Sequence, residues 1–418
     1  MMRGALVARG GRVLMALALL VLIAGCGRRG VTPPTDSRGI QLRAGADLHA
    51  HLIMRSALAP WFQGEPDSGV LASSPTQAFV NPLDSATLQQ AGVRLVVVAL
   101  WPPLDLRPGR TALDEALGQL RALHEFARRH PAFGVATDAA SARALMAQGR
   151  IALLPSIEGG GGISRVEEVD VLYAAGARSL GLVHFTDNRL GDARDAQLGT
   201  ALGPWLNGSS DGLTPLGRQV VLRMVSLGMV VDVSHASERT MRDILALTEP
   251  AGVPVIASHE GAAHASVRTV TPAMAARIGA SGGLIGIGLY RNPIAEPVPD
   301  GERWPGHQPD TCDDVVAHWL YYQRLAGERA VVLGSDLGTP TSRPLPGPGC
   351  PQGIRNSGDL PALFSTLVAR GVSRELLEDS AHRVLQLLER VEAVASPEVR
   401  ADARRRRVFE TPHFASPL

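Results

Sequence analysis

Eight short apolar runs recur along the chain, separated by stretches with helical periodicity. Their residues are mostly apolar instead of alternating with polar ones, which is typical of parallel strands buried on both faces. Alternating strands and helices predict an α/β fold, and eight strands are what a closed TIM-like (β/α)8 barrel needs. A doubly wound open sheet is the competing architecture. The runs span residues 46–51, 93–99, 151–158, 179–184, 229–235, 254–259, 283–288 and 331–336.

The helices between the runs have recognisable ends. Thr214 can cap a helix that Gly228 ends, and residues 111–129 place their leucines on one side. The stretches 53–88 and 291–310 are longer than a strand–helix repeat needs. We therefore expect them to be insertions in loops.

Six of the eight runs end in a charged or imidazole side chain. The carboxyl ends of barrel strands converge on one face, so these six side chains would surround one pocket. This pattern favours the barrel over the open sheet. The six residues are His51, Glu158, His184, His235, His259 and Asp336.

Several of these side chains suit a metal site. His49 and His51 lie two residues apart on a strand and therefore point to the same side, and imidazoles are good zinc ligands. His235 and His259 each follow a serine at the end of an apolar run, and Glu158 precedes four glycines and could bridge two cations. The alternatives are incidental polar residues at strand ends, packed structural histidines and a glutamate that caps the following loop.

Composition narrows the class of ligand. The 41 basic and 40 acidic residues leave a formal net charge of +1. This balance encodes no general attraction to nucleic acid, and a small-molecule substrate fits it better.

The N-terminal residues have the features of an export signal. Three arginines precede an apolar run over residues 13–24, which is too short for a comfortable membrane span. The run ends in Leu-Ile-Ala-Gly-Cys at residues 22–26, which resembles the lipobox of bacterial lipoproteins. The resemblance implies cleavage before Cys26 and diacylation of its thiol. The alternative is an uncleaved anchor helix.

We accordingly expect four segments: a signal peptide over 1–25, a lipidated cysteine and flexible tether over 26–43, the barrel over 44–395 and a C-terminal tail over 396–418. The barrel would lie on the extracytoplasmic side of a bacterial membrane. Gly27 is not the aspartate associated with inner-membrane retention, which favours the outer membrane in a Gram-negative source.

Two cysteines, Cys312 and Cys350, remain after processing. They could pair in an oxidising compartment. Their separation in sequence leaves the disulfide open.

Several motifs together resemble a known family. Residues 157–160 read Ile-Glu-Gly-Gly, 232–235 read Asp-Val-Ser-His and 254–259 read Pro-Val-Ile-Ala-Ser-His; residues 182–184, 212–217 and 227–229 add to the pattern. These segments resemble the membrane (renal) dipeptidase family of the amidohydrolase superfamily, and the likeness extends more loosely over 47–388. It implies a barrel of the metallo-dependent hydrolase type and, as often in the family, a homodimer.

The resemblance also implies roles for individual residues. Two divalent metal ions, expected to be zinc, would be bridged by Glu158, with His49 on one ion and His235 and His259 on the other. His184 and Arg268 match positions that contact the substrate, and Asp336 matches the acidic residue that transfers a proton. A packed imidazole at His184 and a surface arginine at Arg268 are the alternatives.

The chain departs from the family at two places. His51 stands where the family has an aspartate, which lowers the negative charge of the site and could change the preferred metal. Gly338 stands where the family often has a further aspartate. Both departures put the substrate in question more than the fold.

The resemblance predicts hydrolysis of a dipeptide or dipeptide-like amide by a hydroxide that bridges the two metals. A lactonase, phosphotriesterase or deacetylase on the same barrel is the first alternative. The chain contains no lysine, which disfavours enzymes whose metals share a carbamylated lysine. A noncatalytic binding lipoprotein is the second alternative.

Replacement of the lipobox cysteine tests the anchor. We expect Cys26→Ala to abolish acylation and release the protein from the membrane while catalysis is retained, because the tether separates the anchor from the barrel. Labelling with a fatty-acid analogue followed by fractionation measures this. Unchanged lipid labelling of the variant would exclude the anchor.

Overall fold

A computed structural model describes most of the expected barrel domain. Cys26, Arg268 and Cys350 lie outside the described residues, so the lipidation site, the predicted substrate arginine and the disulfide with Cys312 stay predictions. The two expected insertions also fall largely outside. The described residues are 39–53, 83–102, 111–194, 212–260, 270–289, 312–338, 354 and 356–405.

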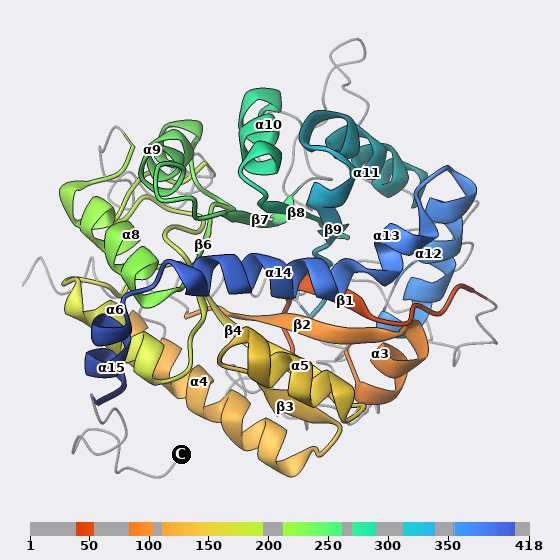
Figure 1. The fold of residues 1–418 in the computed structure, drawn as a ribbon, viewed down its shortest axis with the longest axis horizontal. Coiled ribbons are helices and arrows are strands. Elements are labelled where there is room, and N and C mark those ends of the chain that lie inside the picture. The colour runs from red at the N-terminus through yellow and green to blue at the C-terminus, as the bar shows by residue number, and fades with distance from the viewer. Residues whose placement is uncertain are drawn as a thin grey trace, which may run out of the picture.

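The strands form a closed parallel barrel (Figure 1). β1 (Gly45–Ala50) pairs with β2 (Val93–Leu100) on one side and with β9 (Val331–Leu333) on the other, which closes the ring. This closure confirms the predicted (β/α)8 barrel and excludes the open sheet. The ring continues from β2 through β4 (Ile151–Glu158), β5 (Ser179–Gly181), β6 (Val230–Asp232), β7 (Ile256–Glu260) and β8 (Leu284–Ile287) to β9.

A ninth strand, β3 (Phe133–Val135), was not predicted. It pairs with the first residues of β4 from Ile151, whereas β5 pairs with the last residues of β4 from Ser156. β3 therefore lies beside the ring without entering it.

The predicted helix ends are confirmed. Thr111 and Thr214 cap their helices by accepting hydrogen bonds from backbone N–H groups, and Gly228 ends the second helix at a left-handed φ of 71°. Among the described residues, no helix is long and apolar enough to span a membrane. The helices are α3 (Ser85–Ala91), α4 (Ala112–Arg129), α5 (Ala139–Ala147), α6 (Glu167–Ala174), α8 (Pro215–Leu227), α9 (Glu238–Thr248), α10 (Pro272–Ala280), α11 (Cys312–Ala326), α12 (Leu360–Ala369), α13 (Arg374–Glu378), α14 (Ser380–Ala393) and α15 (Pro397–Arg405).

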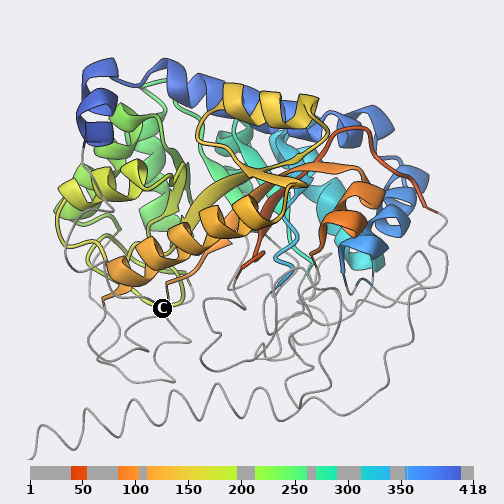
Figure 2. The ribbon, with the colours of Figure 1, turned by 90° about the horizontal axis from the view of Figure 1, so that it is seen from below.

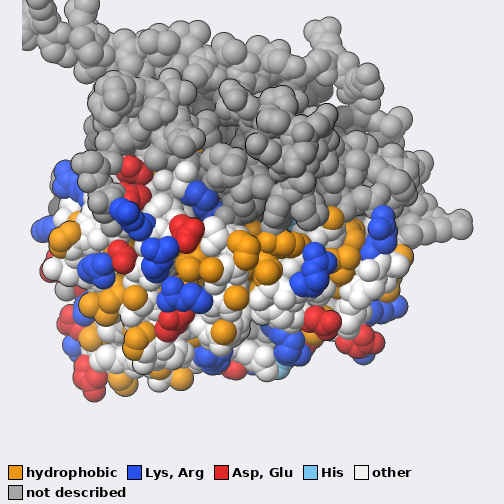
Figure 3. All heavy atoms as spheres, turned by 90° about the horizontal axis from the view of Figure 1, so that it is seen from above, with side chains coloured by type: hydrophobic (Ala, Val, Ile, Leu, Met, Phe, Trp, Pro, Cys, Tyr) orange, Lys and Arg blue, Asp and Glu red, His pale blue; other side chains and the backbone are white. Residues whose placement is uncertain are grey.

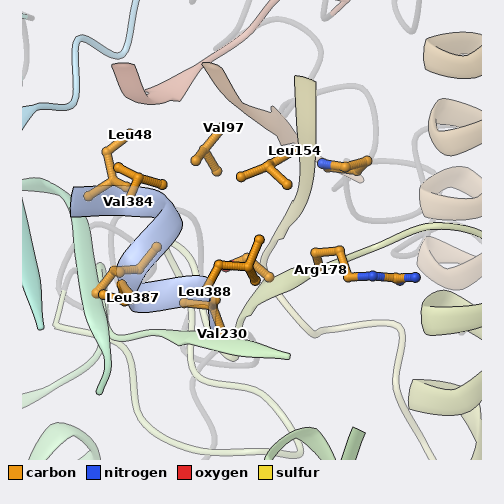
Figure 4. A pocket seen from close by; sticks show the side chains of 11 residues that line it. Leu48, Val97, Leu154, Arg178, Val230, Val384, Leu387 and Leu388 are labelled. Carbon is orange, nitrogen blue, oxygen red and sulfur yellow. The ribbon is translucent and has the colours of Figure 1, made fainter. Parts of the chain in front are cut away.

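Helix α14 covers the amino end of the barrel, where it crosses the ring in Figure 1 and lies along one side in Figure 2. Its start is held to β1 by a hydrogen bond from the Ala46 N–H to the Ser380 hydroxyl, 2.9 Å long. Val384, Leu387 and Leu388 are buried and point toward apolar side chains of the strands (Figure 4). This end of the barrel is therefore a packed core.

The outer surface carries both signs of charge. On the face drawn in Figure 3, basic and acidic side chains of the described residues are interspersed with apolar ones. Ion pairs such as Arg143 with Glu389 (2.7 Å) and Arg277 with Glu249 (2.8 Å) join neighbouring helices. Packed structure also extends past residue 395, because Arg400 of α15 donates a 2.9 Å hydrogen bond to the Tyr173 hydroxyl.

A side-chain substitution in α14 tests how much this helix stabilises the amino end of the barrel. Leu388 is 2% exposed, so Leu388→Ala is expected to lower the free energy of unfolding by about 2–5 kcal/mol through lost burial and a residual cavity. Leu222→Ala on α8 is the control, because its side chain is 52% exposed and surface changes cost about 0.5 kcal/mol or less. Urea unfolding measures both variants. Equal losses of unfolding free energy in the two variants would contradict the packing of α14 against the barrel core.

Candidate metal centre

The carboxyl end of the barrel gathers every described side chain that the sequence predicted for the site. β1 carries His49 and is followed directly by His51, β4 ends in Glu158 and β7 carries His259. The remaining three, His184, His235 and Asp336, follow the ends of β5, β6 and β9. Predicted side chains from six barrel strands thus meet at one place.

Glu158 lies at the centre of this cluster. Its carboxylate is buried and faces five imidazoles. Burial alone would raise the pKa of Glu158, but the neighbouring His49 and His184 outweigh it and hold the pKa well below the usual range. From Oε1, the Nε2 atoms lie at 3.2 Å (His235), 3.4 Å (His184), 3.5 Å (His259) and 3.6 Å (His49), and His51 Nε2 lies 3.4 Å from Oε2.

Asp336 lies on the side of the two β1 histidines. Its Oδ1 is 3.1 Å from His51 Nε2 and 3.7 Å from His49 Nε2. Burial lowers the pKa of both imidazoles, but for His51 the hydrogen bond to Asp336 and the charge of Glu158 outweigh it. The pKa of His51 is therefore raised, whereas that of His49 is lowered.

These separations fit a pair of divalent cations. Ligands at the corners of a zinc tetrahedron lie about 3.4 Å apart, given bonds of about 2.0–2.2 Å. The ligand atoms fall into three overlapping groups, within each of which all lie within 4.8 Å of one another. Nitrogen and carboxylate donors in this geometry suit zinc. The groups are His49, Glu158 and His259; His49, His51 and Asp336; and Glu158, His184 and His235.

His184 differs from the other imidazoles in its exposure. Its side chain is 16% exposed, against 1–4% for the other four. Its ring centroid lies 3.8 Å from that of Phe185 and 5.5 Å from that of Trp101. This imidazole is therefore both close to Glu158 and open to a ligand.

Two site residues have strained backbones. Among the described residues, His235 (φ 63°) and Asp336 (φ 55°) are the non-glycine residues with positive φ. Such a backbone costs about 1–3 kcal/mol and is concentrated at functional sites. It also corrects the predicted runs, because β6 ends at Asp232 and β9 at Leu333. The chain turns at both residues instead of continuing as a strand.

His51 and Gly338, the two residues that depart from the family pattern, lie in contact with each other. Gly338 has a φ of 98°, and a Cβ atom there would lie 2.3 Å from the backbone oxygen of His51. An aspartate at 338 would therefore clash with the His51 backbone, directly after β1. The glycine lets the segment after β9 approach His51 closely.

Sequence reasoning missed two buried carboxylates beneath the ligands. Asp47 accepts hydrogen bonds from the N–H and hydroxyl groups of Ser335, and burial raises its pKa to about 6. Asp232 accepts from the N–H groups of Ser234 (3.0 Å) and Ser258 (3.1 Å), and burial raises its pKa as well. A single acidic residue inside an apolar strand was the signal that could have identified each.

An ion pair beside the site was also missed. Arg194 Nη1 lies 3.1 Å from Glu260 Oε2 and Nη2 lies 3.4 Å from Oε1. Arg194 also donates through its backbone N–H to the oxygen of His235, at 2.6 Å. The pair ties the loop after β5 to the ends of β6 and β7.

Comparisons with known proteins identify the family of the chain. A family model described as membrane dipeptidase (peptidase family M19) matches residues 70–400. The dipeptidase ataJ of Aspergillus terreus is 30% identical over 298 residues, which cover 68% of this chain and 68% of that protein. An uncharacterized dipeptidase, C965.12, of Schizosaccharomyces pombe is 30% identical over 260 residues, which cover 59% of this chain and 55% of that protein.

A solved structure shares the fold. It is a metallopeptidase from Rhodobacter sphaeroides liganded with a phosphinate mimic of the dipeptide L-Ala-D-Ala, with a TM-score of 0.64 and 24% identity. The similarity covers 84% of this chain and 100% of that chain. With the family model spanning most of the barrel and its helices, we conclude that this chain belongs to the membrane dipeptidase family, peptidase family M19.

Proposed function

We propose that the protein is a zinc-dependent dipeptidase. The observation that carries the proposal is the convergence of Glu158, five imidazoles and Asp336 at the carboxyl end of a barrel of this family. Active sites of (β/α)8 enzymes lie at this end. The dipeptide mimic in the Rhodobacter sphaeroides metallopeptidase supports a dipeptide as the substrate class.

The proposed ligand sets are nearly symmetrical. His49 and His51 would hold one cation, His235 and His259 the other, and Glu158 would lie between them. Each cation would then be held by two imidazoles and by the Glu158 carboxylate, which would leave coordination positions open, as in catalytic zinc sites. When bound, such cations lower the pKa of a water so that it supplies hydroxide near neutral pH. They also stabilise the negative charge that develops on the carbonyl oxygen of the amide.

The residues around the cations would manage the substrate and its protons. Asp336 would take the proton of the attacking water and return it to the departing amine. His184, the more exposed imidazole, would orient the substrate carbonyl. Arg268, which lies outside the described residues, would contact the substrate carboxylate.

The proposal includes the place of action. Cys26 would hold the protein at the membrane through its acyl chains, and the barrel would lie on the extracytoplasmic side. Dipeptides there would reach the site without crossing that membrane.

Metal content tests the central carboxylate. The purified protein from Thr35 onward is expected to carry close to two zinc ions per chain, and Glu158→Gln is expected to lose both ions and the activity. Glu249→Gln, which alters a surface ion pair with Arg277, is the control and should keep both. Elemental analysis and dipeptide hydrolysis measure this. A folded wild-type protein that takes up neither zinc nor manganese would refute the proposed function.

Asp336→Asn tests the proton-transfer role. The change is nearly isosteric, so both ions should stay bound while kcat falls by about 10²- to 10⁴-fold, the range for general acid–base groups. Metal analysis and steady-state kinetics on one dipeptide separate the two effects. Near-normal kcat would place proton transfer elsewhere, and loss of one ion would make Asp336 a metal ligand instead.

A further inference from the structure

One serine contacts two of the proposed ligands. Ser258, buried in the middle of β7, places its Oγ 3.0 Å from His49 Nδ1 and 2.9 Å from His259 Nδ1. The two imidazole rings lie side by side, with centroids 3.8 Å apart. His49 and His259 come from β1 and β7, and the proposed function assigns them to different cations.

The hydrogen-bonding capacity of this hydroxyl favours one tautomer of both imidazoles. A serine hydroxyl has one proton to donate and two lone pairs to accept with. Ser258 Oγ donates to Ser234 Oγ at 3.3 Å. Its two lone pairs are then available to two Nδ1–H groups. In this arrangement each imidazole keeps its proton on Nδ1 and leaves its Nε2, which lies 3.6 Å (His49) or 3.5 Å (His259) from Glu158 Oε1, to bind a cation.

The backbone around Ser258 holds the hydroxyl in place. Asp232 Oδ1 accepts the backbone N–H groups of both Ser258 (3.1 Å) and Ser234 (3.0 Å), which ties the end of β6 to β7. The polar groups beneath the ligands are all buried. An imidazole that turned away from Ser258 would leave its Nδ1–H without this acceptor in a dry site, which costs free energy.

We propose that Ser258 is a positioning residue that fixes the Nε2-binding form of one ligand in each cation site, and so couples the two sites. The inference rests on the proposed function for its metal ions. Ser234 stands in the same place before His235, but its Oγ accepts from the backbone N–H of His259 (3.4 Å) and contacts Ser258. The serines of the two Ser-His motifs, at 234–235 and 258–259, therefore make different hydrogen bonds.

Metal affinity is the first test, with Ser258→Ala compared with Ser234→Ala. Loss of a hydrogen bond to a metal-binding histidine typically weakens metal binding by about 10- to 100-fold. Ser258→Ala should weaken both zinc ions in this range in competition with a chelator, and Ser234→Ala should stay closer to wild type. Ser258→Thr keeps the hydroxyl and should restore affinity. Wild-type affinity in Ser258→Ala, or an equal loss in Ser234→Ala, would overturn the proposal.

Imidazole tautomers give a second test that needs no metal. In ¹⁵N spectra of the metal-free full-length protein labelled at histidine, His49 and His259 are expected to be protonated at Nδ1, and this preference should be lost in Ser258→Ala. Nε2-protonated rings in the wild type would overturn the proposal even if the variant does not fold. Nδ1-protonated rings in a wild-type protein that binds no zinc would leave the role of Ser258 standing and refute the proposed function instead.

Discussion

The pairing of β1 with β9 is the contact on which the rest of the structure depends. It closes the ring, and the buried carboxylate of Asp47 reinforces it by accepting two hydrogen bonds from Ser335 across the joint. Without this closure, His49 and His51 would not lie beside Asp336, nearly 300 residues further along the chain. Fold and site thus depend on the same pair of strands.

The closed ring buries two carboxylates at its carboxyl end, and their negative charge has to be compensated. Glu158 and Asp336 are both buried there, and burial of a carboxylate is unfavourable unless positive charge or hydrogen bonds compensate. Five imidazoles surround Glu158, and the chemistry of this donor set matches two divalent cations. Left-handed backbones at His235 and Asp336 add local strain, which the surrounding packing has to offset.

The two ends of the barrel have different tasks. At the amino end, α14 packs apolar side chains against the strand interior, and stability is the main result. At the carboxyl end, successive polar groups are joined by hydrogen bonds. Asp232 accepts from the backbone N–H of Ser258, and the Ser258 hydroxyl contacts His49 and His259. These imidazoles face Glu158. This separation lets the site keep strained and polar groups while the core supplies the stability.

Local sequence signals were sufficient to predict the strands, the helices and the types of side chain at the site. Apolar runs marked the eight barrel strands, capping residues such as Thr214 marked helix ends, and Glu158 and the histidines at run ends predicted a metal site, because these signals are local. The eight-run pattern did not include β3, which pairs with β4 outside the ring. The contacts of Ser258 with two imidazoles and of Asp47 with Ser335 could be seen only in the folded chain. A hydrogen bond between distant residues depends on how the closed barrel brings their strands together.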